Sequence, residues 1–182
     1  DSLDHTAILF ADIVDFTPRS TRMAPGDLIN FLNRVFSAFD ALAEHHGLEK
    51  IKTIGDAYMV AAGLPQPVDR PVHRVAEMAF DMLAATRVIS EELGEEVELR
   101  IGLHAGPVVA GVIGHQKLFY DVWGETVNTA SRMESHGEPG RIQVTAAARE
   151  ALRGSFDFEP RGTVEIKGIG SLQTWWLDKR QN

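Results

Sequence analysis

Residues 48–62 read LEKIKTIGDAYMVAA and contain two short apolar runs, Leu48–Ile54 and Ala57–Ala62. Gly55 and Asp56 separate the runs, and both residue types favour tight turns. Two such runs around a short turn predict a β-hairpin. The sequence therefore contains paired antiparallel strands, and the elements on either side of them determine the class of fold.

Helical patterns lie on both sides of this hairpin. Apolar residues recur at helical spacing over residues 25–47 before it and over Pro71–Leu93 after it, which is typical of amphipathic helices. A buried strand is predicted at Thr6–Phe10, and two further strands are predicted at Glu98–Ala105 and Val108–Ile113.

The remaining elements continue this alternation of helices and strands. The sequence predicts a helix at Glu125–Glu134, a strand at Arg141–Val144, a short helix capped by Thr145 and ending at Leu152, and strands at Phe156–Arg161 and Leu172–Leu177. Strand, helix, paired strands, helix and strand in this order predict an α+β fold. Its sheet is antiparallel-rich, and the helices pack against it.

Composition narrows the classes of function. The 182 residues suffice for one domain with a sizeable core, and we expect a single domain over residues 1–182. The formal net charge of -8 disfavours a nucleic-acid partner held through its phosphates. The chain contains no cysteine, which excludes disulfides, cysteine-bound zinc and a thiol nucleophile. The sequence starts at Asp1 without a methionine, so we expect a piece of a longer protein.

Two aspartates stand where strands end. Asp12 follows the apolar strand predicted at Thr6–Phe10, and Asp56 lies in the turn of the predicted hairpin. If the two strands are neighbours, the carboxylates converge and can bridge two hard divalent cations. The alternative stays open that Asp12 caps a helix and Asp56 only forms a turn, which are common uses of aspartate.

Three longer motifs carry a resemblance to a known family. They read FADIVDFT at 10–17, KIKTIGDAYM at 50–59 and YDVWGETVNTASRME at 120–134. In this order and at these separations they resemble the catalytic domains of class III adenylyl and guanylyl cyclases, in register from about Thr6 to Leu177. The chain is most similar to the bacterial, mycobacterial-type domains that work as homodimers. The resemblance implies a ferredoxin-like core, in agreement with the predicted order of elements.

The resemblance implies a metal site and a phosphate site. By the family's pattern, Asp12 and Asp56 hold two divalent cations, Mg²⁺ or Mn²⁺, and the carbonyl of Ile13 adds a ligand. One cation would lower the pKa of the attacking hydroxyl and the other would bind the outer phosphates. The triphosphate is expected to rest on the backbone amides of Ile13, Val14, Asp15, Phe16 and Thr17.

Lys52 and Asp121 match the family's base-recognition pair. Adenine presents an acceptor at N1 and an amino donor at N6, which a lysine and a carboxylate can match, whereas guanine presents an acceptor at O6. In the family this pair marks adenylyl cyclases, and guanylyl cyclases typically carry glutamate and cysteine. Val122 is counted with the predicted substrate-binding residues. Taken alone, the pair could equally be a surface lysine and a turn aspartate.

Three further residues match positions that contact the nucleotide in the family. Asn128 and Arg132 lie four apart on a predicted helix and share one face. The resemblance assigns Asn128 to the ribose and Arg132 to the charge at the α-phosphate, although an exposed polar face is the plainer interpretation. Lys167 matches a lysine that contacts the terminal phosphates. Many relatives carry a second lysine where this chain has Ile169, which makes Lys167 the weaker assignment.

The activity implied is conversion of ATP to 3′,5′-cyclic AMP and pyrophosphate, by attack of the ribose 3′-hydroxyl on the α-phosphorus. The family pattern places Asp12 and Asp56 in one subunit of a homodimer and the other nucleotide contacts in its partner. Two alternatives stay open, a guanylyl cyclase and a catalytically silent cyclase-like module. The Gly-Gly-Asp/Glu-Glu-Phe signature of diguanylate cyclases is missing. We expect a cytoplasmic domain, compatible with an N-terminal membrane or sensor segment in the parent protein.

Overall fold

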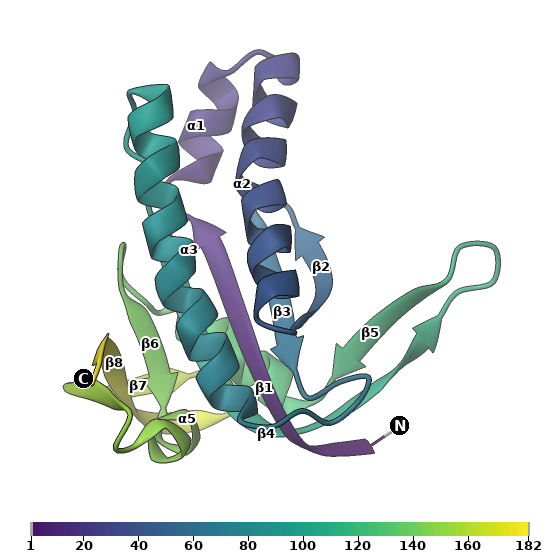
Figure 1. Ribbon diagram of the computed structural model, residues 1–182, viewed down its shortest axis with the longest axis vertical. Coiled ribbons are helices and arrows are strands. Elements are labelled where there is room, and N and C mark those ends of the chain that lie inside the picture. The colour runs from purple at the N-terminus through teal and green to yellow at the C-terminus, as the bar shows by residue number, and fades with distance from the viewer. Residues whose placement is uncertain (1, 182) are drawn as a thin grey trace.

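The computed structural model describes residues 2–181. Within them the chain forms an eight-stranded sheet with the order β2-β3-β1-β4-β6-β8-β7, and β5 pairs with β4 (Figure 1). The strands are β1 (Ser2–Ile13), β2 (Glu49–Ile54), β3 (Ala57–Ala62), β4 (Leu99–Ile113), β5 (Phe119–Trp123), β6 (Ile142–Thr145), β7 (Phe156–Ile166) and β8 (Gly170–Arg180). The helices of the same range are α1 (Phe16–Arg22), α2 (Pro25–His45), α3 (Pro71–Leu93), α4 (Glu125–Ser135) and α5 (Ala146–Leu152).

β1 lies at the centre of the part of the sheet that carries the predicted site. It pairs antiparallel with β3, from Ala7 opposite Ala62 to Ala11 opposite Tyr58. It also pairs antiparallel with β4. The β2–β3 hairpin is formed as predicted, and β4 with β6 is the parallel pair among the named pairings. The predicted α+β fold with an antiparallel-rich sheet is confirmed.

From Thr6 to Ala11 every residue of β1 is buried. Since successive strand residues point to opposite sides of a sheet, both faces of the strand are buried there. Leu9 packs into the cluster that contains Phe39 of α2 and Met82 of α3. Figure 1 shows α2 and α3 running side by side over this face. Phe10 faces the other side and packs in the cluster that contains Ala130 of α4. The sheet thus separates α2 and α3 from α4.

The prediction of two separate strands at Glu98–Ala105 and Val108–Ile113 is wrong, because β4 is one continuous strand. Gly106 stays within it, paired with Thr6 of β1. A Cβ at Gly106 would lie 2.6 Å from Oγ1 of Thr126. The glycine therefore allows α4 to approach the strand and does not end it.

Two elements have no counterpart among the predictions. Helix α1 contains Pro18 and buries no residue fully, so it shows no apolar periodicity. Strand β5 pairs with the outer half of β4, from Val109 opposite Trp123 to Ile113 opposite Phe119. In Figure 1 this hairpin projects away from the rest of the molecule. No helix within residues 2–181 is long and apolar enough to span a bilayer.

Candidate active site

The end of β1 and the β2–β3 turn bring the two predicted metal-binding aspartates together. Asp12 is the penultimate residue of β1, and Asp56 follows Gly55 in the turn. Oδ2 of Asp56 accepts a hydrogen bond of 3.1 Å from the backbone N–H of Ile13. The pairing of β1 with β3 therefore makes the two carboxylates neighbours, as their positions in the sequence predicted.

Arg100 joins this pair and was not identified from the sequence. It lies opposite Asp12 in the register of β1 with β4. Its Nε and Nη2 donate to the two carboxylate oxygens of Asp12 at 3.2 and 3.1 Å, a bidentate pairing that fits the planar guanidinium. These hydrogen bonds raise the pKa of Arg100. In the sequence, Arg100 is marked only as the one charged residue in the otherwise apolar run 99–103.

Glu134 is the second residue that the sequence analysis missed. It points from α4 into the sheet and is 6% exposed. Its Oε2 lies 3.9 Å from Nε of Arg100 and accepts no hydrogen bond from the described residues. Burial, followed by the nearby charge of Asp12, raises the pKa of Glu134 to about 8. A carboxyl group is thus held beside Arg100 by the packing of α4.

The charges of this cluster suit a divalent cation. The carboxylates of Asp12 and Asp56 lie near the single guanidinium of Arg100, and the raised pKa of Glu134 keeps this third carboxyl group from adding a full negative charge. Burial raises the pKa of Asp56, and the charge of Asp12 raises it further, so the two aspartates lie within electrostatic range of each other. Carboxylate oxygens are the ligands that Mg²⁺ and Mn²⁺ prefer.

Two aspartates leave most of a metal coordination sphere to other ligands. Among residues 2–181 there is no group of three or more histidine, cysteine, aspartate and glutamate side chains placed to hold a metal ion. Mg²⁺ is commonly bound through one or two carboxylates together with substrate phosphates. The residues present therefore fit cations that arrive with a nucleotide.

A second group of predicted residues forms a separate pair. Nζ of Lys52 on β2 lies 2.9 Å from Oδ2 of Asp121 on β5. The other carboxylate oxygen of Asp121 accepts a hydrogen bond of 2.8 Å from the backbone N–H of Val122. Asp121 is 5% exposed, whereas the side chain of Lys52 is 40% exposed. The two predicted base-reading residues are thus brought together, with the lysine open to solvent.

Asn128 and Arg132 lie on the exposed face of α4, while Thr129, Met133 and Glu134 form its buried side. Neither side chain forms a hydrogen bond or ion pair with another described residue. Glu134 reaches the carboxylate cluster from this helix, but Arg132 points away from it, because residues two apart on a helix do not face the same way. The structure therefore does not bring Arg132 to Asp12 within one chain.

The remaining predicted phosphate contacts are placed at two loops. The N–H of Ile13 is bonded to Asp56, and the N–H of Val14 donates to the carbonyl of Glu98 at 2.9 Å. Asp15 adopts the left-handed conformation, with a φ of 56°, and α1 begins at Phe16 and continues through Thr17. Lys167 is exposed in the turn between β7 and β8. The roles of these residues stay predictions.

Comparison with known proteins identifies the family. Residues 1–179 match the family described as the adenylate and guanylate cyclase catalytic domain. The chain therefore belongs to this family and is a class III nucleotide cyclase domain.

Relatives with both substrate specificities are similar to the chain. The adenylate cyclase of Mycobacterium tuberculosis (strain ATCC 25618 / H37Rv) is 48% identical over 181 residues, which cover 100% of this chain and 41% of that protein. The guanylate cyclase soluble subunit beta-2 of Rattus norvegicus is 43% identical over 177 residues, which cover 96% of this chain and 26% of that protein. The chain thus spans less than half the length of these relatives.

A solved structure shares the whole fold. The guanylate cyclase domain of RhGC from Catenaria anguillulae, determined in complex with GTP, aligns with a TM-score of 0.95 at 35% identity, and the alignment covers 100% of both chains. This similarity confirms the predicted class III cyclase core.

Proposed function

We propose that this domain is an adenylyl cyclase that converts ATP to 3′,5′-cyclic AMP and pyrophosphate. The observation that carries this proposal is the ion pair of Lys52 with Asp121. A cationic donor and a carboxylate acceptor stand side by side, and adenine offers an acceptor at N1 next to a donor at N6. Guanine offers an acceptor at O6, which would face the carboxylate of Asp121 without a proton between them.

Guanylyl cyclase activity is the second candidate, because relatives named as guanylate cyclases are similar over almost the whole chain. Asp121 argues against it. The carboxylate is buried and already receives hydrogen bonds from Lys52 and Val122. Placing a further acceptor against such a group leaves a buried mismatch, which costs about 1–3 kcal/mol.

The carboxylate cluster is the proposed site for two divalent cations, Mg²⁺ or Mn²⁺. Asp12, Asp56 and the carbonyl of Ile13 would hold them. When bound, such cations lower the pKa of the 3′-hydroxyl and neutralise charge on the phosphates. Arg100 donates to both oxygens of Asp12, so a cation bound by Asp12 would compete with this guanidinium, whose permanent positive charge would then be available to the phosphates.

The two groups of residues form separate clusters in the folded chain, which supports a composite site. Lys52 turns to β5, while Asp56, four residues later, bonds to β1. Arg132 and Asn128 face solvent. We infer that Asp12 and Asp56 of one subunit act with Lys52, Asp121, Val122, Asn128, Arg132 and Lys167 of a second copy. Each nucleotide would then lie between two subunits.

The β4–β5 hairpin supports such a homodimer. It carries exposed apolar side chains, of which Val112 is 65%, Leu118 is 64% and Phe119 is 51% exposed. Contiguous exposed apolar residues mark interaction surfaces in soluble proteins. A second copy that covered this hairpin would bury them.

In this arrangement each side chain has a distinct task. Arg132 stabilises negative charge that develops on the α-phosphate, and Asn128 orients the ribose. Lys167 and the amides of residues 15–17 bind the phosphates of the leaving pyrophosphate, whereas the N–H groups of Ile13 and Val14 already donate to Asp56 and to the carbonyl of Glu98. The 3′-oxygen forms its bond to the α-phosphorus as the bond to pyrophosphate breaks, and the hydroxyl proton leaves to solvent or to a phosphate oxygen.

We further propose that residues 1–182 form a single catalytic domain of a larger, cytoplasmically oriented enzyme. The chain covers 41% of the mycobacterial relative, and one relative is named a membrane guanylyl cyclase from Dictyostelium discoideum. A membrane or sensor segment in the parent protein is compatible with this organisation.

The test is product formation by the purified chain. ATP or GTP is supplied with Mg²⁺ or Mn²⁺, and cyclic AMP and cyclic GMP are separated by chromatography. We expect cyclic AMP from ATP to be the main product, and Arg132→Ala serves as the inactive control. Cyclic GMP as the main product would support the guanylyl cyclase candidate, and no product from a dimeric, metal-loaded protein would support the silent module.

A further inference from the structure

The guanidinium of Arg100 lies between two carboxyl groups. Its Nε and Nη2 donate to the oxygens of Asp12 at 3.2 and 3.1 Å. The same Nε lies 3.9 Å from Oε2 of Glu134. Hydrogen bonds between a cation and a carboxylate are usually about 2.7–2.9 Å long. The contact with Asp12 is therefore longer than an optimal ion pair, and a second carboxyl group stands next to it.

Oε2 of Glu134 is an acceptor without a donor. The residue is 6% exposed, and this oxygen is buried and has no hydrogen-bond partner among the described residues. Buried polar atoms almost always have a partner, because leaving one unsatisfied costs free energy. A shift of about 1 Å would bring Nε of Arg100 to hydrogen-bond distance from this oxygen.

The fold fixes Glu134 and leaves Arg100 room to move. Helix α4 packs so closely on β4 that a Cβ at Gly102 would collide with the backbone nitrogen of Glu134. The carbonyl of Met133 also accepts a hydrogen bond of 2.9 Å from Nε2 of Gln143. Arg100 lies two residues before Gly102 and so points to the same face of the sheet. Its side chain is long and 33% exposed, so the guanidinium is the group that can shift.

A cation at Asp12 has to displace this guanidinium, because both carboxylate oxygens are occupied by it. Taking away the partner of a partly buried charge is costly when nothing replaces it. A ligand also binds more weakly when only a fraction of the molecules is competent to receive it. An acceptor for the displaced guanidinium would therefore raise the affinity for the cation.

We propose that Glu134 receives the guanidinium of Arg100 when a divalent cation binds to Asp12, and that it is thereby a positioning residue of the metal site. Nε exchanges an oxygen of Asp12 for Oε2 of Glu134. A carboxyl group accepts hydrogen bonds in its neutral as well as its ionised form, so the exchange does not depend on the charge of Glu134. This inference rests on the proposed metal site at Asp12.

The first test follows the Nε–H signal of Arg100 by nuclear magnetic resonance while Mg²⁺ is added to the isotope-labelled chain. The signal is identified by its absence from Arg100→Gln. We expect it to move and to stay protected from exchange with water, because the N–H passes from one carboxyl group to another. Rapid exchange at saturating Mg²⁺ would show that the guanidinium turns to solvent, and an unmoved signal would show that it stays on Asp12. Either result would overturn the proposal.

The second test is the affinity for Mn²⁺ without nucleotide, measured by electron paramagnetic resonance. Glu134→Leu fills the same space without an acceptor and should bind Mn²⁺ about tenfold more weakly. Glu134→Gln keeps a carbonyl acceptor and should retain most of the affinity. In the Arg100→Gln background, Glu134→Leu should change the affinity by less than about twofold. An equal loss in both backgrounds would mean that Glu134 acts on the cation directly, which would overturn the proposal.

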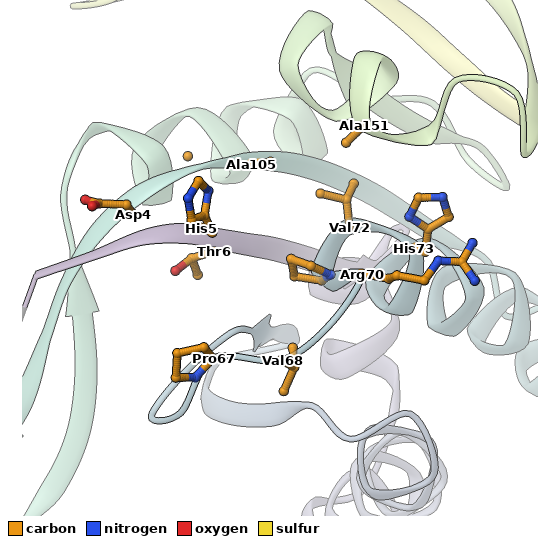
Figure 2. A pocket seen from close by; sticks show the side chains of 12 residues that line it. Asp4, His5, Thr6, Pro67, Val68, Arg70, Val72, His73, Ala105 and Ala151 are labelled. Atoms are coloured by element: carbon orange, nitrogen blue, oxygen red, sulfur yellow. The ribbon is translucent and has the colours of Figure 1, made fainter.

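Two variants control for the loss of charge, and calorimetry verifies folding. Arg70→Gln removes an exposed arginine from the lining of a separate cavity, shown in Figure 2, which contains neither Asp12 nor Glu134. Glu138→Leu removes an exposed acid beyond the end of α4. Both should bind Mn²⁺ as wild type does. Binding that Asp12→Ala does not weaken would contradict the metal site itself. Binding that depends on Asp12 but is normal in Glu134→Leu would overturn only the role of Glu134.

Discussion

The ammonium group of Lys52 lies 2.9 Å from a carboxylate oxygen of Asp121, although the two residues are 69 positions apart. The contact ties β2 at the edge of the sheet to β5 of the projecting hairpin. Asp121 is further fixed by the N–H of Val122. A donor and an acceptor are therefore held at a set separation before any nucleotide arrives, and pre-organised polar pairs of this kind discriminate strongly between similar substrates.

The first prediction concerns base specificity. Lys52→Glu combined with Asp121→Cys should lower kcat/KM for ATP by several powers of ten, because both hydrogen-bonding groups of the site would then oppose the adenine edge. Steady-state kinetics with ATP and GTP measure this. Lys50→Glu, which reverses the charge of an exposed lysine on the same strand, is the control and should retain ATP turnover. Unchanged ATP kinetics in the double variant would show that the pair does not read the base.

The second prediction concerns the aspartates. Asp12→Ala or Asp56→Ala should nearly abolish turnover and Mn²⁺ binding while leaving the fold intact, since each removes a ligand from a partly exposed cluster. Electron paramagnetic resonance counts bound Mn²⁺, and calorimetry checks folding. Asp27→Ala, an exposed acid of α2, should behave as wild type. A folded, fully active Asp12 or Asp56 variant would contradict the two-metal assignment.

The third prediction follows from the bidentate contact of Arg100 with Asp12. The guanidinium occupies the oxygens that a cation would bind, so the two compete. Arg100→Gln should therefore bind Mn²⁺ several-fold more tightly than wild type when no nucleotide is present. Titration followed by paramagnetic resonance measures this affinity. Equal or weaker binding would mean that Asp12 is not the metal ligand, or that Arg100 does not compete for it.

The fold could be predicted where periodicity is strong. Helices α2 and α3 have long buried stripes, and the β2–β3 hairpin has a clear turn, so all three were identified. Helix α1 buries no residue fully, and β5 has only five residues on a projecting hairpin. Neither element therefore leaves an apolar periodicity in the sequence that is long enough to predict it. The continuity of β4 across Gly106 depends on its partners in space.

The residues of the candidate site also divide into those that the sequence predicts and those that it does not. Asp12, Asp56, Lys52 and Asp121 belong to recognisable motifs at turns and strand ends. Arg100 acquires its role only through the register of β1 with β4. Glu134 reaches the cluster because α4 packs against Gly102, where a Cβ would lie 2.2 Å from the backbone nitrogen of Glu134. Contacts that depend on sheet register and helix packing have no local signal.

The fourth prediction concerns stability against pH. Burial lowers the pKa of His104 from 6.5 to about 4 in the folded chain, and its Nδ1 lies 2.6 Å from Oγ1 of Thr145. The unfolded chain therefore takes up the proton first as pH falls. The contribution of neutral His104 is complete above about pH 6.5 and is lost towards pH 4, by at most roughly 3 kcal/mol.

Chemical denaturation at a series of pH values measures this effect. The free energy of unfolding of His104→Gln should fall less between about pH 7 and pH 4.5 than that of wild type. His115→Gln, which changes an exposed histidine, should retain the wild-type dependence. A parallel decline in wild type and His104→Gln would assign the acid sensitivity to other groups.

The central claim is that each active site is built from two copies of the chain. The geometry supports it, because Arg132 is exposed on α4 and Asp12 is bound to Arg100 on the other side of that helix. Asp12→Ala and Arg132→Ala homodimers should each be nearly inactive, since every site carries one lesion. In a mixed dimer one site carries both lesions and the other carries neither.

The decisive measurement is therefore cyclic AMP production by a mixture of Asp12→Ala and Arg132→Ala subunits after exchange. With random exchange about half of the dimers are mixed and each has one intact site of two, so activity should recover to roughly a quarter of wild type. Mass spectrometry of differently tagged subunits verifies the exchange. Recovery to this level is the result we predict, and no recovery despite complete exchange would place the whole site within one chain.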